Sequence, residues 1–272
     1  AWCRTCDDIA DGQDHGGAMS VVADAQARLS DMRVMTDRAL RGEPTGDPAF
    51  DGFGLVMREC RIPHRYAHDL IEGFALDARD WRPRSQDDML RYCYHVAGAV
   101  GCMMAVLMGV DPHDDATLDR ACDLGLAFQL ANIARDIGED EAADRCYLPV
   151  EWLVEMDIPP GEHMKPWVRP RLAILGRRLT DMAAAYEDSA RHGTGMLPPR
   201  AAWAVLAAAG IYGDIARTVA RRGPMAWDHR VVTRKSDKLM WVARAGIQVV
   251  GRARRWPADA ERPSTLWHRP AS

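Results

Sequence analysis

Two short acidic clusters are the parts of this sequence best suited to chemistry. Asp7 and Asp11 in the first cluster, and Asp136 and Asp140 in the second, are each separated by four positions. On a helix this spacing places both carboxylates on one face, where like charges destabilise the helix unless a cation offsets them. Carboxylate oxygens are hard ligands suited to Mg²⁺, which binds one or two carboxylates together with substrate phosphates. Two such pairs therefore favour a metal–diphosphate site over a solvated acidic face.

Arginines accompany both clusters. Arg4 precedes the first cluster, and Arg135 stands directly before Asp136 in the second. Guanidinium groups bind phosphate oxygens through paired hydrogen bonds, so carboxylates for metal and arginines for phosphate together describe a diphosphate site. Arg145 and Tyr147 follow the second cluster and add another cation and a phenol near it.

A polar stripe runs along the helix predicted around the second cluster. Its members recur at spacings of three and four residues: Gln129, Asn132, Asp136 and Asp140. Polar groups that face a core need partners, or each costs about 1–3 kcal/mol. The stripe therefore predicts groups that hold a ligand, and the alternative is a polar stripe on the solvated surface of the helix.

Helical patterns cover most of the chain. No window shows clear period-two alternation, β-branched residues are sparse, and Ala, Leu, Met and Arg are common. The stretch from Asp157 to Pro170 is predicted to be a loop, and no repeat or linker divides the chain. We predict one all-α domain over residues 1–272, with helices at Ala18–Arg41, Phe50–Arg61, Pro63–Asp80, Gln86–Met108, Thr117–Ile137, Pro170–His192, Pro199–Arg222 and Ser236–Arg255.

Composition and charge exclude several classes of protein. The 272 residues are 47% hydrophobic and 27% charged, with a formal net charge of −4. This balance excludes a disordered chain and disfavours a nucleic-acid-binding protein. Seven scattered cysteines fit a reducing cytoplasm and exclude a secreted disulfide scaffold. The first residues look like the middle of a helix and lack the regions of a signal peptide, so we expect a further segment to precede them.

One apolar stretch has the length of a membrane span. Tyr92 to Val110 are 19 residues without Asp, Glu, Lys or Arg. The Tyr, His and Cys residues within this stretch, and the acidic residues Asp87 and Asp88 before it, favour a helix buried in a helical bundle. Such a helix would line the tunnel of a protein that handles a long hydrocarbon.

Three long motifs, in the right order, resemble the squalene/phytoene synthase family and most of all its bacterial phytoene synthases. Trp2–Gln13 is similar to the first Asp-rich helix of the family. Tyr92–Gly101 and Leu124–Pro149 resemble its two signature segments. The resemblance runs from Ala1 to about Lys238, which is most of the chain.

The resemblance implies an all-α isoprenoid-synthase fold, a helical bundle whose central cavity carries the two Asp-rich motifs on facing helices. Mg²⁺, or Mn²⁺ in its place, would be held by Asp7, Asp11, Asn132, Asp136 and Asp140 and would bridge to diphosphate. Substrate contacts would come from Arg4, Gln129, Arg135, Arg145 and Tyr147, and also from Tyr212 and Arg230. Tyr92 would assist proton transfer or steady cations, and the tunnel wall would include Val96, Ala97, Val100 and Phe128.

The resemblance also implies the reaction. Two geranylgeranyl diphosphates would be joined head to head, through prephytoene diphosphate, to phytoene in carotenoid biosynthesis. No NADPH is expected, since no nicotinamide-binding glycine motif follows a strand. One alternative is a C30 enzyme that makes dehydrosqualene or squalene from farnesyl diphosphate, which tunnel depth would decide. Another is a non-catalytic assembly factor, against which the intact pairs of aspartates argue.

The expected partners are prenyl diphosphates, downstream carotenoid enzymes and a membrane surface, and no nucleic acid. Phytoene cannot remain in water, so peripheral contact with the inner face of the membrane, from the cytoplasm, is expected. A cationic, aromatic set near the C-terminus is either a membrane-contact face or solvated helix surface: Arg217, Arg221, Arg222, Arg252, Arg254 and Arg255, with Trp241 and Trp256.

Overall fold

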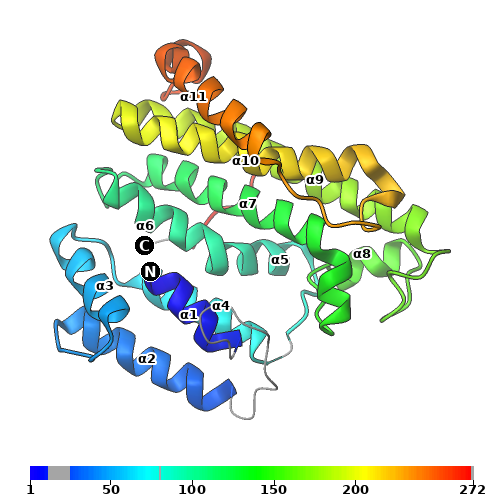
Figure 1. Ribbon diagram of the computed structural model, residues 1–272, viewed down its shortest axis with the longest axis horizontal. Helices are drawn as coiled ribbons and strands as arrows, with labels where there is room; N and C mark the ends of the chain where they lie inside the picture. The colour runs from blue at the N-terminus through cyan, green and yellow to red at the C-terminus, as the bar shows by residue number, and fades with distance from the viewer. Residues whose placement is uncertain (12–24, 80, 271–272) are drawn as a thin grey trace.

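The protein is a helical bundle whose longer helices lie in three tiers (Figure 1). The computed structural model describes residues 1–11, 25–79 and 81–270, and every regular element in these ranges is helical, as predicted. One outer tier contains α1 (Trp2–Asp11), α2 (Ala25–Arg41), α3 (Pro48–Glu59) and α4 (Arg65–Asp77). The central tier contains α5 (Gln86–Cys93), the π-helix η1 (Tyr94–Gly98), α6 (Ala99–Leu107) and α7 (Asp115–Ala142). The other outer tier contains α9 (Arg169–Gly193), α10 (Pro199–Arg222) and α11 (Lys235–Arg255), and the short elements are α8 (Val150–Glu155), η2 (Thr194–Met196) and η3 (Gly223–Met225).

Helix boundaries follow signals that the sequence displays. Ser85 and Asp88 form a capping box at the start of α5, and Asp114 Oδ1 accepts a hydrogen bond from the Thr117 N–H (3.1 Å) at the start of α7. The predicted helix Pro199–Arg222 is confirmed in full as α10. The start of the helix predicted from Ala18, and the last residue of the one predicted to end at Asp80, lie outside the described residues. The six-residue α8 was not predicted, because so short a helix shows no periodicity.

Helix α7 is longer than its sequence pattern predicts. The predicted helix ends at Ile137, whereas α7 continues through Gly138 to Ala142, although glycine weakens helices. Gly138 lies beside Met164, where an added Cβ would lie 3.1 Å from the Met164 Cε. The extension keeps Asp136 and Asp140 on one face of the same helix.

A π-helical turn interrupts the predicted helix Gln86–Met108 and sets which residues face inward. In a regular α-helix, residues four positions apart differ in direction around the helix axis by about 40°. A long row of such residues therefore winds slowly around the helix. The wider turn of η1 adds a residue and reduces this drift. Val96, Ala97 and Val100 therefore all lie on the inner wall together with Tyr92, as predicted.

The run Gln86–Leu107 is, within the described part of the chain, the one helical stretch long and apolar enough to cross a membrane by length and composition. Inside the bundle, 56% of its most apolar window is buried. Helices at the centre of a helical protein have this character, in agreement with the prediction of a core helix.

Two glycines allow the central helices to approach each other closely. A Cβ on Gly101 would lie 2.4 Å from the Ala121 carbonyl oxygen, and a Cβ on Gly125 would lie 2.4 Å from the Ala97 carbonyl oxygen. Real Cβ atoms essentially never come within 3.0 Å of another heavy atom, and a backbone oxygen cannot rotate away as a side chain can. These glycines therefore determine how closely α7 packs against η1 and α6.

We expect Gly125→Ala to destabilise the protein by at least about 2 kcal/mol, because α7 and η1 would have to separate. The matched control is Gly52→Ala in α3, where an added Cβ meets nothing within 4 Å. There alanine should stabilise the helix by about 0.5–1 kcal/mol. Urea unfolding measures both free energies, and a Gly125→Ala variant as stable as the control would contradict the prediction.

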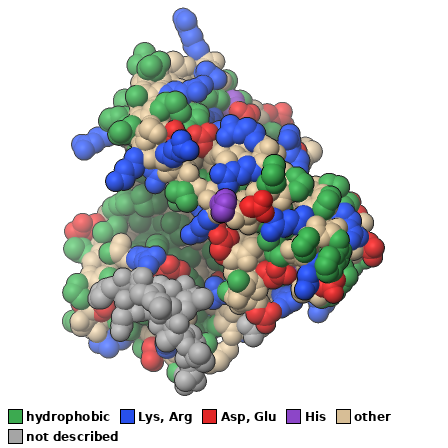
Figure 2. All heavy atoms as spheres, turned by 45° about the vertical axis from the view of Figure 1, so that its right-hand side comes forward, with side chains coloured by type: hydrophobic (Ala, Val, Ile, Leu, Met, Phe, Trp, Pro, Cys, Tyr) green, Lys and Arg blue, Asp and Glu red, His purple; other side chains and the backbone are tan. Residues whose placement is uncertain are grey.

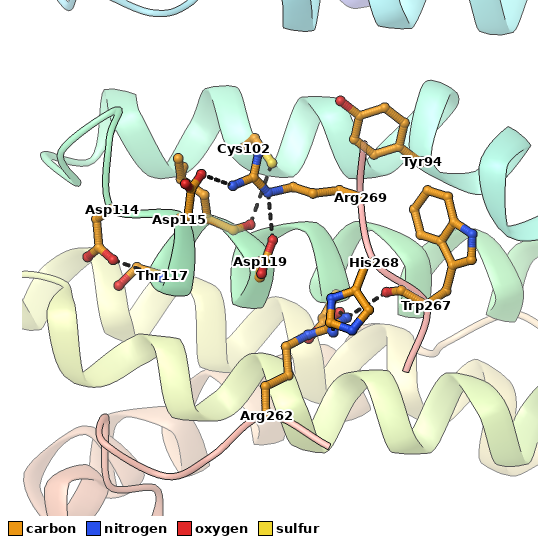
Figure 3. Close-up of polar contacts among 12 residues, drawn as sticks. Tyr94, Cys102, Asp114, Asp115, Thr117, Asp119, Arg262, Trp267, His268 and Arg269 are labelled. Atoms are coloured by element: carbon orange, nitrogen blue, oxygen red, sulfur yellow. Dashed lines mark hydrogen bonds and ion pairs between the residues drawn. The ribbon is translucent and has the colours of Figure 1, made fainter. Parts of the chain in front are cut away.

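The segment that follows α11 crosses back over the outer face of α7 (Figure 3). The Arg262 guanidinium pairs with Asp123, whose side chain has no exposed surface (Nη2–Oδ1 2.7 Å). Arg269 pairs with Asp119 (Nε–Oδ1 2.6 Å) and with Asp115. The three aspartates recur every four residues on one face of α7, opposite its cavity face, so two arginines of the C-terminal segment neutralise that face.

We expect Arg262→Met to destabilise the protein by about 3–5 kcal/mol, since it leaves the buried Asp123 carboxylate without its cation. Burial raises the pKa of Asp123 while Arg262 opposes that shift, so the variant should raise this pKa further. A raised carboxyl pKa in the folded state makes stability fall as pH rises, so the loss should be larger at neutral than at acidic pH. The control, Arg177→Met, removes an exposed pair with Asp181 (2.8 Å) and should cost at most about 1 kcal/mol. Equal losses in the two variants would contradict the prediction.

Two tryptophans near the C-terminus, Trp241 and Trp256, were predicted to lie on a membrane-contact face or on solvated helix surface. Both are buried. Trp241 is 7% exposed and Trp256 is 5% exposed, so both alternatives for these residues are wrong. Trp241 donates to Asp214 and packs over Gly210, because the inner face of α11 lies on α10. Arg252 donates to the Thr194 carbonyl (3.1 Å), which also turns it away from the outer face.

Candidate active site

A cavity of 1110 Å³ lies between the tiers. Its lining comes from α1, α2, α4, the run from α5 to α6, α7 and α10, together with the ends of α9 and η2. Figure 2 shows a hollow on this side of the molecule, with hydrophobic side chains inside it and basic and acidic side chains at its edge. The volume exceeds the range of about 300–1,000 Å³ typical of small-molecule pockets, so the cavity suits a large ligand.

One part of the cavity is polar and is lined by residues of the first acidic motif and of the helix that carries the second. Arg4 in α1 lies 3.0 Å from Asp8 (Nη2–Oδ1) and 3.5 Å from Asp7 (Nη1–Oδ2). Its side chain is 61% exposed and therefore accessible to a ligand. The predicted residues that the structure brings together on this part of the wall are Arg4, Asp7, Gln129, Asn132, Arg145 and Tyr147.

Asp136 lies one helical turn beyond Asn132 and is engaged with two arginines. Its Oδ1 accepts hydrogen bonds from Arg135 Nε (2.7 Å) and from Arg230 Nε (3.1 Å). The bonds to Asp136 raise the pKa of Arg135. The structure thus brings these three predicted residues into one cluster, but beside the cavity rather than on its wall.

Asp140 is half-buried in a negatively charged environment. Burial is the largest cause that raises its pKa to about 7, and the charges of Asp136, Glu139 and Asp77 raise it as well, while Arg145 opposes them. A divalent cation among these oxygens would remove the repulsion, and hard oxygen ligands suit Mg²⁺.

The side-chain oxygen of Asn132 is also suited to bind a cation. This atom, Oδ1, is buried without a hydrogen-bond partner although the side chain lines the cavity. Over the described residues, no three acidic, histidine or cysteine side chains are grouped closely enough to hold a metal by themselves. Nothing is described of the side chain of Asp11, the last residue of α1. The metal site therefore stays a prediction, with Asp7 and Asn132 on the wall and Asp136 and Asp140 on the following turns of α7.

Most of the remaining cavity wall is apolar or aromatic, and it contains every residue predicted for the tunnel. Phe128 and Tyr212 stack on each other with ring centres 4.1 Å apart. Apolar walls suit a hydrocarbon, and the faces of aromatic rings attract a cation. The predicted residues on this part of the wall are Val96, Ala97, Val100, Phe128 and Tyr212.

Asp77, the last residue of α4, lines the cavity and was missed in the sequence. It accepts hydrogen bonds from Tyr92 Oη (3.1 Å) and Tyr147 Oη (2.9 Å). Burial, and next the charge of Asp77, raise the pKa of Tyr92 well above its usual value. No sequence pattern marks Asp77, because its two partners stand 15 and 70 positions away along the chain.

Sequence comparison places the chain among enzymes of one family. The profile of the squalene/phytoene synthase family matches residues 1–237. The phytoene synthase of Pseudescherichia vulneris is 46% identical over 271 residues, which cover 99% of this chain and 86% of that protein. The 15-cis-phytoene synthase of Pantoea ananas is 44% identical over 273 residues, covering 99% of this chain and 87% of that protein.

Solved structures show the same fold. A dehydrosqualene synthase superposes with a TM-score of 0.80 at 24% identity, over 92% of this chain and 84% of that one. A squalene synthase from Alicyclobacillus acidocaldarius superposes with a TM-score of 0.69 at 26% identity, over 82% of this chain and 80% of that one. Fold, profile and relatives agree, and the chain belongs to the squalene/phytoene synthase family.

Proposed function

We propose that this chain is a phytoene synthase, a prenyltransferase that joins two geranylgeranyl diphosphates head to head to form phytoene in carotenoid biosynthesis. The observation that carries the proposal is the cavity of 1110 Å³, which connects carboxylates, arginines and amides to a largely apolar interior. The names of the bacterial relatives at 44–46% identity favour this reaction over the C30 alternative.

The size of the cavity is consistent with a long hydrocarbon, because its 1110 Å³ exceeds the range typical of small-molecule pockets.

Mg²⁺, or Mn²⁺, fits the oxygen ligands at the polar end. Asp7, Asn132, Asp136 and Asp140, together with Asp11, are the residues that would hold it. The unpartnered Asn132 Oδ1 and the raised pKa of Asp140 support this assignment. A bound divalent ion supplies positive charge against the diphosphate that departs from the substrate.

The chain's own residues then have separate roles in the reaction. Arg4, Gln129 and Arg145 would hold diphosphate oxygens, so that negative charge is neutralised when the carbon–oxygen bond breaks and an allylic cation forms. The apolar wall excludes water that would capture the cation, and the aromatic rings of Phe128 and Tyr212 are part of that wall.

Carbon–carbon bond formation would follow in two stages. The C2=C3 double bond of the second substrate attacks the cation, and loss of a proton closes the cyclopropane of prephytoene diphosphate. A second ionisation, a rearrangement and another proton loss give phytoene. Tyr92, whose hydroxyl lies at the polar end of the cavity, would assist these proton losses.

Product analysis after incubation with Mg²⁺ and either geranylgeranyl or farnesyl diphosphate tests the proposal. We expect phytoene from the C20 substrate. A C30 hydrocarbon from the C15 substrate alone would contradict the chain-length assignment but keep the chemistry. A protein that binds neither diphosphate in the presence of Mg²⁺ would instead fit a non-catalytic assembly factor.

We also propose that α11 contacts a membrane. Its outer face carries an apolar stripe in which Leu239, Ile247 and Val250 are 71%, 78% and 89% exposed. Exposed basic residues flank the stripe, and Figure 2 shows hydrophobic and basic side chains side by side at the top of the molecule, where α11 lies. This combination favours an anionic lipid surface. The basic residues are Lys235, Lys238, Arg244 and Arg254.

We expect the double variant Ile247→Asp, Val250→Asp to weaken binding to anionic lipid vesicles at least about tenfold. Two apolar side chains that would be buried in the membrane then carry a charge. Val154→Asp is the control, since Val154 is 73% exposed on α8, away from α11. Co-sedimentation with anionic and with zwitterionic vesicles measures the effect. Unchanged binding of the double variant would contradict the proposed contact.

We propose that the protein is attached peripherally to the cytoplasmic face of the inner membrane. All seven cysteines are free thiols, which supports a reducing compartment. Phytoene leaves water for the lipid, where downstream carotenoid enzymes would receive it. Fractionation of cells tests this, with the protein expected in a membrane fraction from which high salt releases it.

A further inference from the structure

Each carboxylate oxygen of Asp77 accepts a hydrogen bond from a tyrosine. Oδ2 accepts from Tyr92 Oη (3.1 Å), and Oδ1 accepts from Tyr147 Oη (2.9 Å). All three side chains line the cavity at its polar end, together with Arg145. Tyr92 comes from α5 and Tyr147 from the segment after α7, so Asp77 joins three separate parts of the fold.

The position of Asp77 is electrostatically unfavourable by itself. It is the last residue of α4, where the carbonyl end of the helix dipole repels a negative charge. Its charge is also among the causes that raise the pKa of Asp140. An acidic side chain at this place destabilises its surroundings unless the tyrosine hydrogen bonds and nearby cations compensate, so packing alone does not explain it.

The two phenols are held in fixed positions. Tyr92 stacks on Tyr147 with ring centres 4.9 Å apart, and Trp81 stacks on Tyr92 at 5.6 Å. Tyr92 is 4% exposed and Tyr147 is 9% exposed. Because a phenol has one proton to donate and Asp77 receives it in both cases, the phenol oxygens are left as acceptors.

We propose that Asp77 is a positioning residue that keeps the oxygens of Tyr92 and Tyr147 directed at the reacting cation and accepts the proton that Tyr92 passes on. A C–H bond of the carbocation breaks, and its electron pair forms the new carbon–carbon bond. The released proton moves to Tyr92 Oη, whose own proton moves to Asp77 Oδ2. The positive charge of the cation and the negative charge of Asp77 disappear together, and Asp77 returns its proton to solvent when product leaves. This inference rests on the proposed function.

The same fold contains a matched pair outside the cavity. Tyr94 Oη donates to Asp69 Oδ2 (2.6 Å), again from the central helix to α4. Neither residue is part of the cavity lining. Asp69→Asn therefore removes an equivalent tyrosine–carboxylate bond between the same tiers without touching the site.

The test compares Asp77→Asn with Asp69→Asn by two readouts, kcat and the ratio of diphosphate released to hydrocarbon formed. We expect Asp77→Asn to lower kcat about a hundredfold, the range of a lost proton acceptor, with KM within about twofold. The ratio should rise above the value of two that a coupled reaction requires, because cations that lose their proton slowly are captured by water. A substitution that only disturbed the fold would reduce diphosphate release and hydrocarbon formation in proportion, and the ratio would stay at two.

The outcomes separate this inference from the proposed function. A wild-type chain that forms no hydrocarbon overturns the proposed function itself. Wild-type hydrocarbon synthesis with an Asp77→Asn variant that keeps kcat and the ratio of two overturns only the role of Asp77. If Asp77→Asn does not fold, the double variant Tyr92→Phe, Tyr147→Phe removes both donors and retains the carboxylate. It should show the same raised ratio, and a ratio of two in that variant overturns the inference.

Discussion

Asp136→Asn is expected to lower kcat for hydrocarbon formation by about a thousandfold or more while helix content stays unchanged. The substitution removes the charge that holds Arg135 and Arg230 together and one of the oxygens assigned to Mg²⁺. Charge neutralisation of a departing diphosphate is needed most in the transition state, so the loss should fall on kcat. Asparagine and aspartate have similar helix propensities, so α7 should persist. Steady-state kinetics and circular dichroism measure the two quantities.

A matched control separates this effect from the general loss of a carboxylate on a helix. Asp181→Asn removes a carboxylate that pairs with Arg177 four residues earlier on α9, where the Asp181 side chain is 62% exposed. An exposed pair of this kind contributes at most about 1 kcal/mol to stability, and its loss should leave kcat unchanged. If Asp136→Asn retains activity close to that of Asp181→Asn, the metal assignment is wrong.

Ala121→Phe is expected to shift substrate preference from C20 toward C15 by at least about tenfold in the ratio of kcat/KM values. Ala121 lines the cavity on α7, eleven residues before Asn132 and thus about 16 Å from it along the helix axis. The fourth isoprene unit lengthens an extended chain by roughly 5 Å, the span of four carbon–carbon bonds. A phenyl ring at this depth overlaps that unit, and an overpacking cost of about 1.4 kcal/mol or more, within the usual range of about 1–3 kcal/mol, corresponds to a change of tenfold or more.

Competition between geranylgeranyl and farnesyl diphosphate in one reaction gives this ratio directly. Ala184→Phe on the exposed side of α9 adds the same ring away from the cavity and should leave the ratio unchanged. A ratio in Ala121→Phe equal to that of the control would show that this part of the cavity does not hold the end of the substrate.

Local patterns predicted most of the helices and half of the site. A period of 3.6 residues depends only on neighbours along the chain, which is why α10 agrees with the prediction at both ends. The same periodicity placed Gln129 and Asn132 on one face of α7, whereas Val96 and Val100 were expected on the tunnel wall from the family resemblance. At Gly138 the helix continues despite the low helix propensity of glycine, so the predicted boundary was wrong by several residues.

The sequence by itself therefore determined the helical fold class, the polar stripe and the acidic pairs, because each is a spacing within one helix. Only the tertiary structure decided that Asp77 accepts hydrogen bonds from Tyr92 and Tyr147, and that Arg230 donates one to Asp136. It also decided that Trp241 is buried while Ile247 is exposed. The three contacts join residues separated by 15, 70 and 94 positions. Their existence depends on how whole helices pack, which many residues determine together and no short pattern records.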